Sequence, residues 1–132
     1  MAITKDFNRQ CVMSAILTIG FADLLGTSGT DLGAIELPPN AIVTGGAVVT
    51  KTAMNSGTSD VLDIGDAGSQ NRYLNDGNIH ATGIVPLVPT GYVHPGGNLT
   101  VRWVGAGAAP TAGSVQIRVD YVQVGRGEYT QG

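Results

Sequence analysis

The strongest constraint on the fold is an alternation of apolar and polar residues with a period of two near the C-terminal end of the chain. Val115, Ile117, Val119 and Tyr121 alternate with the polar residues between them. Successive side chains of a β-strand point to opposite faces, so this pattern predicts a half-buried strand. After Tyr121 the apolar set shifts by one residue while the period stays at two, which indicates a bulge or a strand that changes sheets.

Other segments have the composition of strands. They share short runs of β-branched or alternating apolar residues near glycine or proline, and they span residues 12–21, 41–52, 61–64, 83–88 and 98–103. A short helix gives a pattern similar to that of residues 12–21, so this assignment rests on the apolar character of one face. Gly45 and Gly46 mark a bend or the close approach of another backbone. Pro86 cannot donate a backbone hydrogen bond, which predicts an edge strand or an interruption there.

The composition favours many short elements joined by tight turns. The 132 residues include 20 glycines and 6 prolines without a regular period, and such a chain has the size of one domain. We therefore predict an all-β fold, an antiparallel β-sandwich or jelly roll, as a single domain over residues 1–132. Residues 1–10 and 125–132 are predicted to be an N-terminal arm and a C-terminal tail. The small-residue segment GAGAAPTAG (105–113) predicts a hairpin between the strands on either side of it.

The low charge content indicates a surface that is covered by other molecules. Only 13% of the residues are charged, against about a quarter in an average soluble domain, and we expect copies of the chain or a partner to cover part of the surface. The net charge is −3 and the seven basic residues do not cluster, which argues against nucleic-acid binding. No apolar run approaches the roughly twenty residues of a membrane span, and residues 11–26 lack the cleavage site of a signal peptide.

Few residues have a context suited to catalysis. His80 and His94 stand in no metal-binding motif and are interpreted as turn or surface residues. Cys11 lies beside apolar residues, which predicts a buried and inert thiol. The sequence contains no G-x-S-x-G motif. We therefore predict no catalytic residue, no cofactor and no enzymatic activity.

The segment DIGDAGSQNRYLND (63–76) is the strongest candidate for a ligand site. Asp63, Asp66 and Asp76 offer oxygen ligands of the kind that calcium prefers, but their spacing is not that of an EF-hand, so no metal ligand is assigned. The alternative is a strand, a turn and a second strand, with Asp and Asn side chains bonded to the turn backbone.

Arg72 and Tyr73 in this segment belong to the residue types that most often anchor protein interfaces. An exposed pair would be a contact point for a partner. Because neighbouring residues of a strand point to opposite faces, a buried Tyr73 beside a solvated Arg72 is an equally open alternative. Trp103 alternates with apolar residues and is predicted to lie in the core rather than to form a platform for sugars.

Part of the chain resembles a group of small structural proteins of tailed bacteriophages. The resemblance is carried by LPPNAIVTGGAVVTKTAMNSGTSDVLDIGDAGSQNRYL (37–74), TGY (90–92), GAGAAPTAG and VQIRVDYVQVGR (115–126), and it covers about two-thirds of the chain. The group includes capsid decoration, or cement, proteins with a jelly-roll fold. The resemblance implies a non-catalytic virion protein on the exterior of the capsid, made in the host bacterial cytoplasm, that stabilises contacts between major capsid protein subunits.

The partners implied are the major capsid protein and further copies of the chain, as a dimer or trimer, without nucleic acid or membrane. The arms suit this role, since segments that order on contact can brace a neighbour, although terminal residues are often simply frayed. By residue type, the interface is predicted to include Arg72 and Tyr73 and four arm residues: Phe7, Arg9, Arg126 and Tyr129.

Two other classes of function compete with this one. The first is a phage tail or fibre module that recognises carbohydrate on a host, which would need several exposed aromatic side chains, whereas aromatic residues make up only 5% of the sequence. The second is a small jelly-roll enzyme, which would need a metal or a nucleophile that the motifs do not supply.

Overall fold

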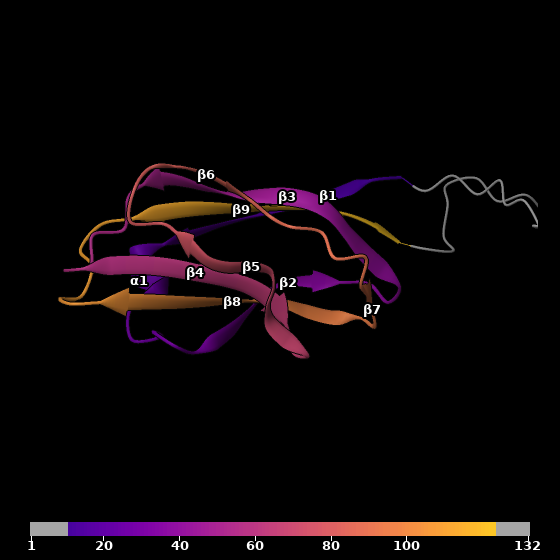
Figure 1. The fold of residues 1–132 in the computed structure, drawn as a ribbon, viewed down its shortest axis with the longest axis horizontal. Coiled ribbons are helices and arrows are strands. Elements are labelled where there is room, and N and C mark those ends of the chain that lie inside the picture. Colours follow the sequence, from indigo (N-terminus) through magenta and orange to yellow (C-terminus); the bar gives the residue numbers. More distant parts are fainter. Residues whose placement is uncertain (1–10, 124–132) are drawn as a thin grey trace, which may run out of the picture.

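The computed structural model describes residues 11–123, which form two packed antiparallel sheets (Figure 1). Sheet A contains, in spatial order, β1 (Met13–Gly20), β9 (Ser114–Gln123), β3 (Ala41–Thr52) and β6 (Gly83–Pro86), and the short β7 (Val93–His94) also pairs with β3. Sheet B contains β2 (Asp31–Leu37), β8 (Gly97–Ala106), β4 (Ser59–Asp66) and β5 (Ser69–Asn78). A single helical turn, α1 (Phe21–Leu24), follows β1. The predicted all-β antiparallel sandwich is confirmed, whereas the predicted arms lie outside the described residues.

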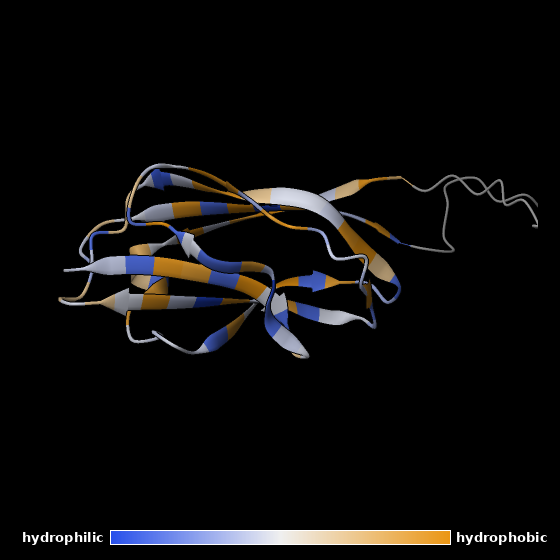
Figure 2. Cartoon of the chain, viewed as in Figure 1, coloured by the Kyte–Doolittle hydropathy of each residue, from blue (hydrophilic) through white to orange (hydrophobic). Residues whose placement is uncertain are grey.

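The core lies between the two sheets and is built by alternation along each strand. Figure 2 shows this alternation as successive hydrophobic and hydrophilic bands along the strands. In β9, Val115, Ile117 and Val119 are buried, as predicted, and Trp103 in β8 is buried with them. Burying an aliphatic side chain of this size stabilises a fold by roughly 1.5–3 kcal/mol, so these inward rows fix which face of each strand points to the core.

The predicted hairpin between β8 and β9 is wrong, because the two strands belong to different sheets. Their connection crosses one end of the sandwich and is held there by the loop after β3. The Asn55 side-chain oxygen accepts hydrogen bonds from the backbone N–H groups of Thr111 (2.7 Å) and Ala112 (2.9 Å), and Gly57 donates its N–H to the carbonyl oxygen of Ala108. Alternation specifies the buried face of a strand but not its neighbour, so it could not exclude this crossing.

The glycine pair in β3 is a site of close backbone approach, as predicted. Gly46 has φ +132°, and a Cβ atom there would lie 2.1 Å from the carbonyl oxygen of Arg118. The register between β3 and β9 shifts between Val43 and Gly45, opposite Tyr121 and Asp120. The irregularity predicted at Tyr121 therefore lies in the partner strand, and β9 stays in sheet A. The predicted position of Pro86 on an edge strand is confirmed.

The prediction for Cys11 is wrong, because this residue is exposed. It precedes β1 and so lies before the first strand that contributes to the core. In the described part of the chain, no helix has the length and apolar composition needed to cross a membrane.

Candidate interaction surface

Arg72 connects β5 to two other parts of the molecule. Its Nε lies 2.6 Å from Asp66 Oδ2 and its Nη2 lies 3.1 Å from Asp66 Oδ1, while its guanidinium stacks 3.6 Å from the centre of the Tyr92 ring. Burial alone would raise the pKa of Asp66, but the bonds from Arg72 and from the N–H groups of Ser69 and Gly68 outweigh it and lower the pKa. The Arg72 side chain is 20% exposed, so it acts mainly as an internal brace.

Tyr73 faces the core, which decides between the two alternatives left open by the sequence. The residue is 2% exposed, and burial raises its pKa to about 12. It therefore cannot meet a partner at the surface of the folded chain, and the prediction of an exposed Arg72–Tyr73 pair is corrected. The other predicted interface residues, Phe7, Arg9, Arg126 and Tyr129, lie outside the described residues.

The 63–76 segment forms a hairpin, with β4 and β5 joined by a turn at residues 67–68. Its carboxylates bond to the protein itself. Asp63 Oδ1 accepts the N–H of Asp76 at 2.6 Å, and Asp66 Oδ1 accepts the N–H groups of Gly68 and Ser69, each at 3.0 Å. Among residues 11–123, no three acidic, histidine or cysteine side chains form a group suited to a metal ion.

A buried polar network surrounds Asp60, which is fully buried at the start of β4. Its carboxylate accepts hydrogen bonds from Trp103 Nε1 (2.8 Å), Ser56 Oγ (2.5 Å) and the Ser56 N–H (3.0 Å), and it lies 2.7 Å from His80 Nδ1. Burial alone would raise the pKa of Asp60, but these bonds outweigh it and lower the pKa. Sequence reasoning missed this network, although Asp60 has the same parity as the inward Leu62 and Ile64.

The network does not have the geometry of a nucleophilic site. Ser56 and His80 both bond to the Asp60 carboxylate, whereas an activated serine donates to the histidine. His94 is 3% exposed, so its interpretation as a turn or surface residue is wrong. It belongs to β7, where it pairs with the fully buried Ala41, and its Nδ1 accepts the N–H of Gly96.

The outer face of sheet A, called face A below, is rich in apolar side chains. Directly paired residues of an antiparallel sheet share a face, so the registers define its rows. Face A comprises Ser14, Ile16, Thr18, Ile42, Gly45, Ala47, Val49, Ile84, Pro86, Val93, Gln116, Arg118, Asp120 and Val122. Ile84 is 69% exposed and Ile16 is 62% exposed. Such apolar exposure is typical of a surface that another molecule covers.

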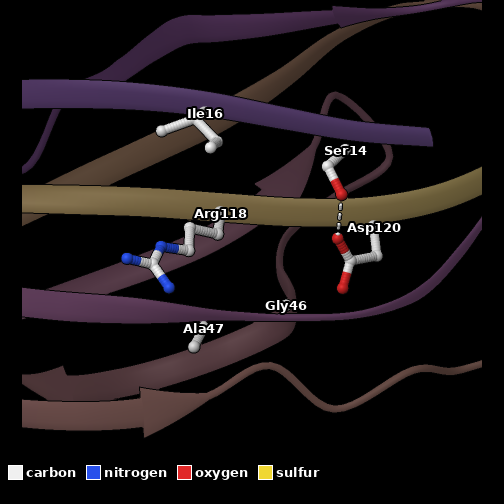
Figure 3. A pocket seen from close by; sticks show the side chains of 6 residues that line it. All are labelled: Ser14, Ile16, Gly46, Ala47, Arg118 and Asp120. Atoms are coloured by element: carbon white, nitrogen blue, oxygen red, sulfur yellow. Dashed lines mark hydrogen bonds between the residues drawn. The ribbon is translucent and has the colours of Figure 1, made fainter.

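A shallow hollow of about 460 Å³ lies in the middle of face A. Figure 3 shows Arg118 and Asp120 on β9 between Ser14 and Ile16 of β1 and Gly46 and Ala47 of β3. The hollow forms because β3 offers only small residues there. Ser14 Oγ donates a hydrogen bond to Asp120 Oδ1 at 2.6 Å.

The outer face of sheet B, called face B, is polar, and its charged groups bond within the chain. Arg102 Nε lies 2.7 Å from Asp31 Oδ1, and Asp63 pairs with Arg102 across β4 and β8. The Asp31 pair raises the pKa of Arg102. Val104 is the exposed large apolar residue of this face, at 39%.

Chains in three solved capsid structures have a similar fold. A chain of the "Cyanophage Pam1 capsid asymmetric unit" matches with a TM-score of 0.68 and 21% identity, over 92% of this chain and 91% of that chain. For the "Acidic stable capsid structure of Helicobacter pylori bacteriophage KHP30" the TM-score is 0.59 and the identity 12%, over 86% and 92% of the two chains. For the "Capsid of Ralstonia phage GP4" the values are 0.57 and 16%, over 96% and 92%.

At these identities the likeness concerns the fold. No protein-family model matches the sequence, and a search of curated proteins gives no match.

Proposed function

We propose that this protein is a structural component of a phage virion that binds the outside of the head and stabilises contacts between major capsid protein subunits, without catalysis. The observation that carries the proposal is the likeness of nearly the whole chain to chains in three phage capsid structures. The chain forms homo-oligomers, is made in the host bacterial cytoplasm, and takes its place on the shell during assembly.

The strand order supports the narrower prediction of a jelly roll. The order β1-β9-β3-β6 faces β2-β8-β4-β5, so each sheet holds four main strands and neighbours far apart in the sequence. Two four-stranded antiparallel sheets with crossing connections are the arrangement of a jelly roll. Such a body is rigid and presents broad sheet faces, which suits a protein that makes contacts rather than chemistry.

The proposed contacts to the shell come from the two arms. Met13 of β1 pairs with Tyr121 of β9, so the segments before β1 and after β9 leave the sandwich at the same end. We assign shell contacts to four arm residues: Phe7, Arg9, Arg126 and Tyr129. Arg72 is a further proposed contact through the exposed fifth of its side chain.

Stabilisation follows from binding linkage. A protein that binds the assembled shell more tightly than free subunits lowers the free energy of the shell by RT ln(1 + [L]/Kd) per site, which is about 2.7 kcal/mol at a hundredfold excess over Kd. The size of the effect depends on affinity and occupancy, so no active site is required.

The test uses shells of the encoding phage assembled without this chain. Purified labelled protein should co-sediment with these shells, saturate at a fixed number of copies, and be displaced by unlabelled protein. A matched variant with Phe7, Arg9, Arg126 and Tyr129 all changed to alanine should lose binding while keeping its thermal unfolding temperature. Absence of co-sedimentation, together with retention on a glycan array, would replace the proposal with the carbohydrate-binding module.

A further inference from the structure

We propose that face A packs against face A of a second copy of this chain in a two-fold dimer. The two-fold axis lies in the interface and crosses β9 at a right angle above Val119. The inference specifies the self-association included in the proposed function, and it is argued from the pattern of charge and size on face A itself.

The charges on face A fit this symmetry. Arg118 and Asp120 lie two residues apart on β9, about 7 Å along the strand, and point to the same face (Figure 3). Neither forms an ion pair within the described residues, where Ser14 bonds to Asp120 and Gln116 bonds to Arg118. Rotation about the proposed axis places Arg118 over Asp120 of the second copy and repeats the pair on the other side. An axis parallel to β9 would instead place like charges over each other.

The side-chain sizes fit the same rotation. It exchanges the row of Arg118 with the row of Asp120, so each bulky residue faces a small one. Ile16, which pairs with Arg118, comes to lie over Ser14 of the second copy, because Ser14 pairs with Asp120. Ala47 comes to lie over Gly45 in the same way. The protruding Ile16 thus meets the lower part of the opposite face, which is the relation that close packing requires.

The flanking rows bring apolar residues together. The row that contains Val49 and Ile84 is exchanged with the row that contains Ile42 and Val93. Ile84 is 69% exposed and Val93 is 48% exposed in the single chain. Contact between them removes apolar surface from water at both ends of β3, and this burial supplies the main favourable free energy of association.

A second copy fits this surface better than an unrelated partner because the complementarity lies within face A. In a two-fold interface each contact between two different residues occurs twice, so a surface that pairs with itself must carry matched charges and sizes at symmetric positions. The rows around Val119 meet this condition for charge, for size and for apolar character. Face B does not meet it, since Arg102 is already paired with Asp31 in the same chain.

The test is sedimentation velocity of the full chain without shells, from about 1 to about 100 µM, a range that spans weak to moderate association. The wild type should reach the mass of two 13.5 kDa protomers. Arg118→Asp and Asp120→Arg should each raise the dimer dissociation constant at least about tenfold, because each change places two like-charge contacts in the interface. The double variant that carries both changes should return to within about threefold of the wild type, since the pairs are restored with reversed sign.

Two further variants separate face A from face B. Ile84→Asp should weaken the dimer at least about tenfold, whereas Val104→Asp on face B should leave the dissociation constant unchanged within about twofold. Matching thermal unfolding curves should show that all variants are folded. A monomeric wild type, a trimeric mass, equal loss in the Ile84 and Val104 variants, or a double variant as weak as the single ones would overturn the proposal. These outcomes leave shell binding to its own assay, so failure of the dimer and failure of the shell role are distinguishable.

Discussion

The two outer faces of the sandwich differ in how their polar groups are used. On face B, and along the hairpin beside it, the carboxylates bond to arginines or backbone N–H groups of the same chain, as in the Arg102–Asp31 and Arg72–Asp66 pairs. On face A, Arg118 and Asp120 have no ion pair among the described residues and are flanked by exposed aliphatic side chains such as Ile16 and Ile84.

The difference teaches which face is built to stabilise the chain and which is built to meet another molecule. Groups that already bond within the chain contribute to folding, and a partner would have to compete for them. Groups that are exposed and apolar contribute little to folding and gain most from a partner. Substitutions on the sheet B side should therefore cost stability, whereas substitutions on face A should cost association.

The largest effect is expected for Asp60→Ala in β4. This change leaves Trp103 Nε1 and the two Ser56 donors buried without their acceptor, and each orphaned group costs roughly 1–3 kcal/mol, so we expect a loss of about 3–5 kcal/mol in the free energy of unfolding. Urea denaturation measures the loss. Asp31→Ala, in an exposed ion pair, is the control and should cost much less. Equal losses in the two variants would show that the buried network does not stabilise the fold.

Arg72→Ala should have the next largest effect. It removes a bidentate pair with the buried Asp66 and the stacking on Tyr92, for an expected loss of about 2 kcal/mol. Arg102→Ala, whose ion pair is exposed, is the matched control with a smaller loss. The same two variants test the proposed shell contact of Arg72, because only Arg72→Ala should weaken co-sedimentation. Replacing Tyr73 as well would be uninformative, since that residue is part of the core.

Acid should destabilise the sheet B side through Asp60 and Asp66. The pKa of each is lowered in the folded state from the ordinary value of 3.8, so each contributes stability that is present above pH 3.8 and is lost as pH falls through the lower folded-state pKa. Unfolding measured from about pH 5 to about pH 2.5 should show this loss. The decrease should be shallower in Arg72→Ala. A wild-type stability that stays constant over this range would contradict the assignment.

The smallest effect on folding is expected for Ile84→Asp on face A. Ile84 is largely exposed on the short edge strand β6, so the free energy of unfolding of the monomer should change by less than about 0.5 kcal/mol. Thermal or urea unfolding at low protein concentration measures it. A loss as large as that of Arg72→Ala would mean that face A contributes to the fold, and the contrast between the faces would fail.

The strands could be predicted from the sequence where one face of a strand is buried. Alternation at Val115, Ile117 and Val119 identified β9, and the glycine pair at Gly45 and Gly46 identified a close approach of backbones. Pairing could not be predicted in the same way, because Leu99 and Val115 carry the same signal whether their strands are neighbours or lie in opposite sheets. The hairpin predicted between β8 and β9 was wrong for this reason.

The candidate surface was beyond the sequence for a related reason. Ile16, Ile84 and Val93 are apolar residues in strands, which predicts burial as readily as exposure. Only the registers reveal that they share one outer face. Arg72 and Tyr73 were predicted as contacts by residue type alone, and the structure places one in an internal ion pair and the other in the core.

The most direct test of the central claim is the dissociation temperature of shells of the encoding phage assembled without this chain, measured while purified protein is added. The account predicts that the temperature rises with occupancy and levels off when all sites are filled. The variant with Phe7, Arg9, Arg126 and Tyr129 changed to alanine should give no rise. A dissociation temperature that stays constant at saturating wild-type protein would contradict the proposed role.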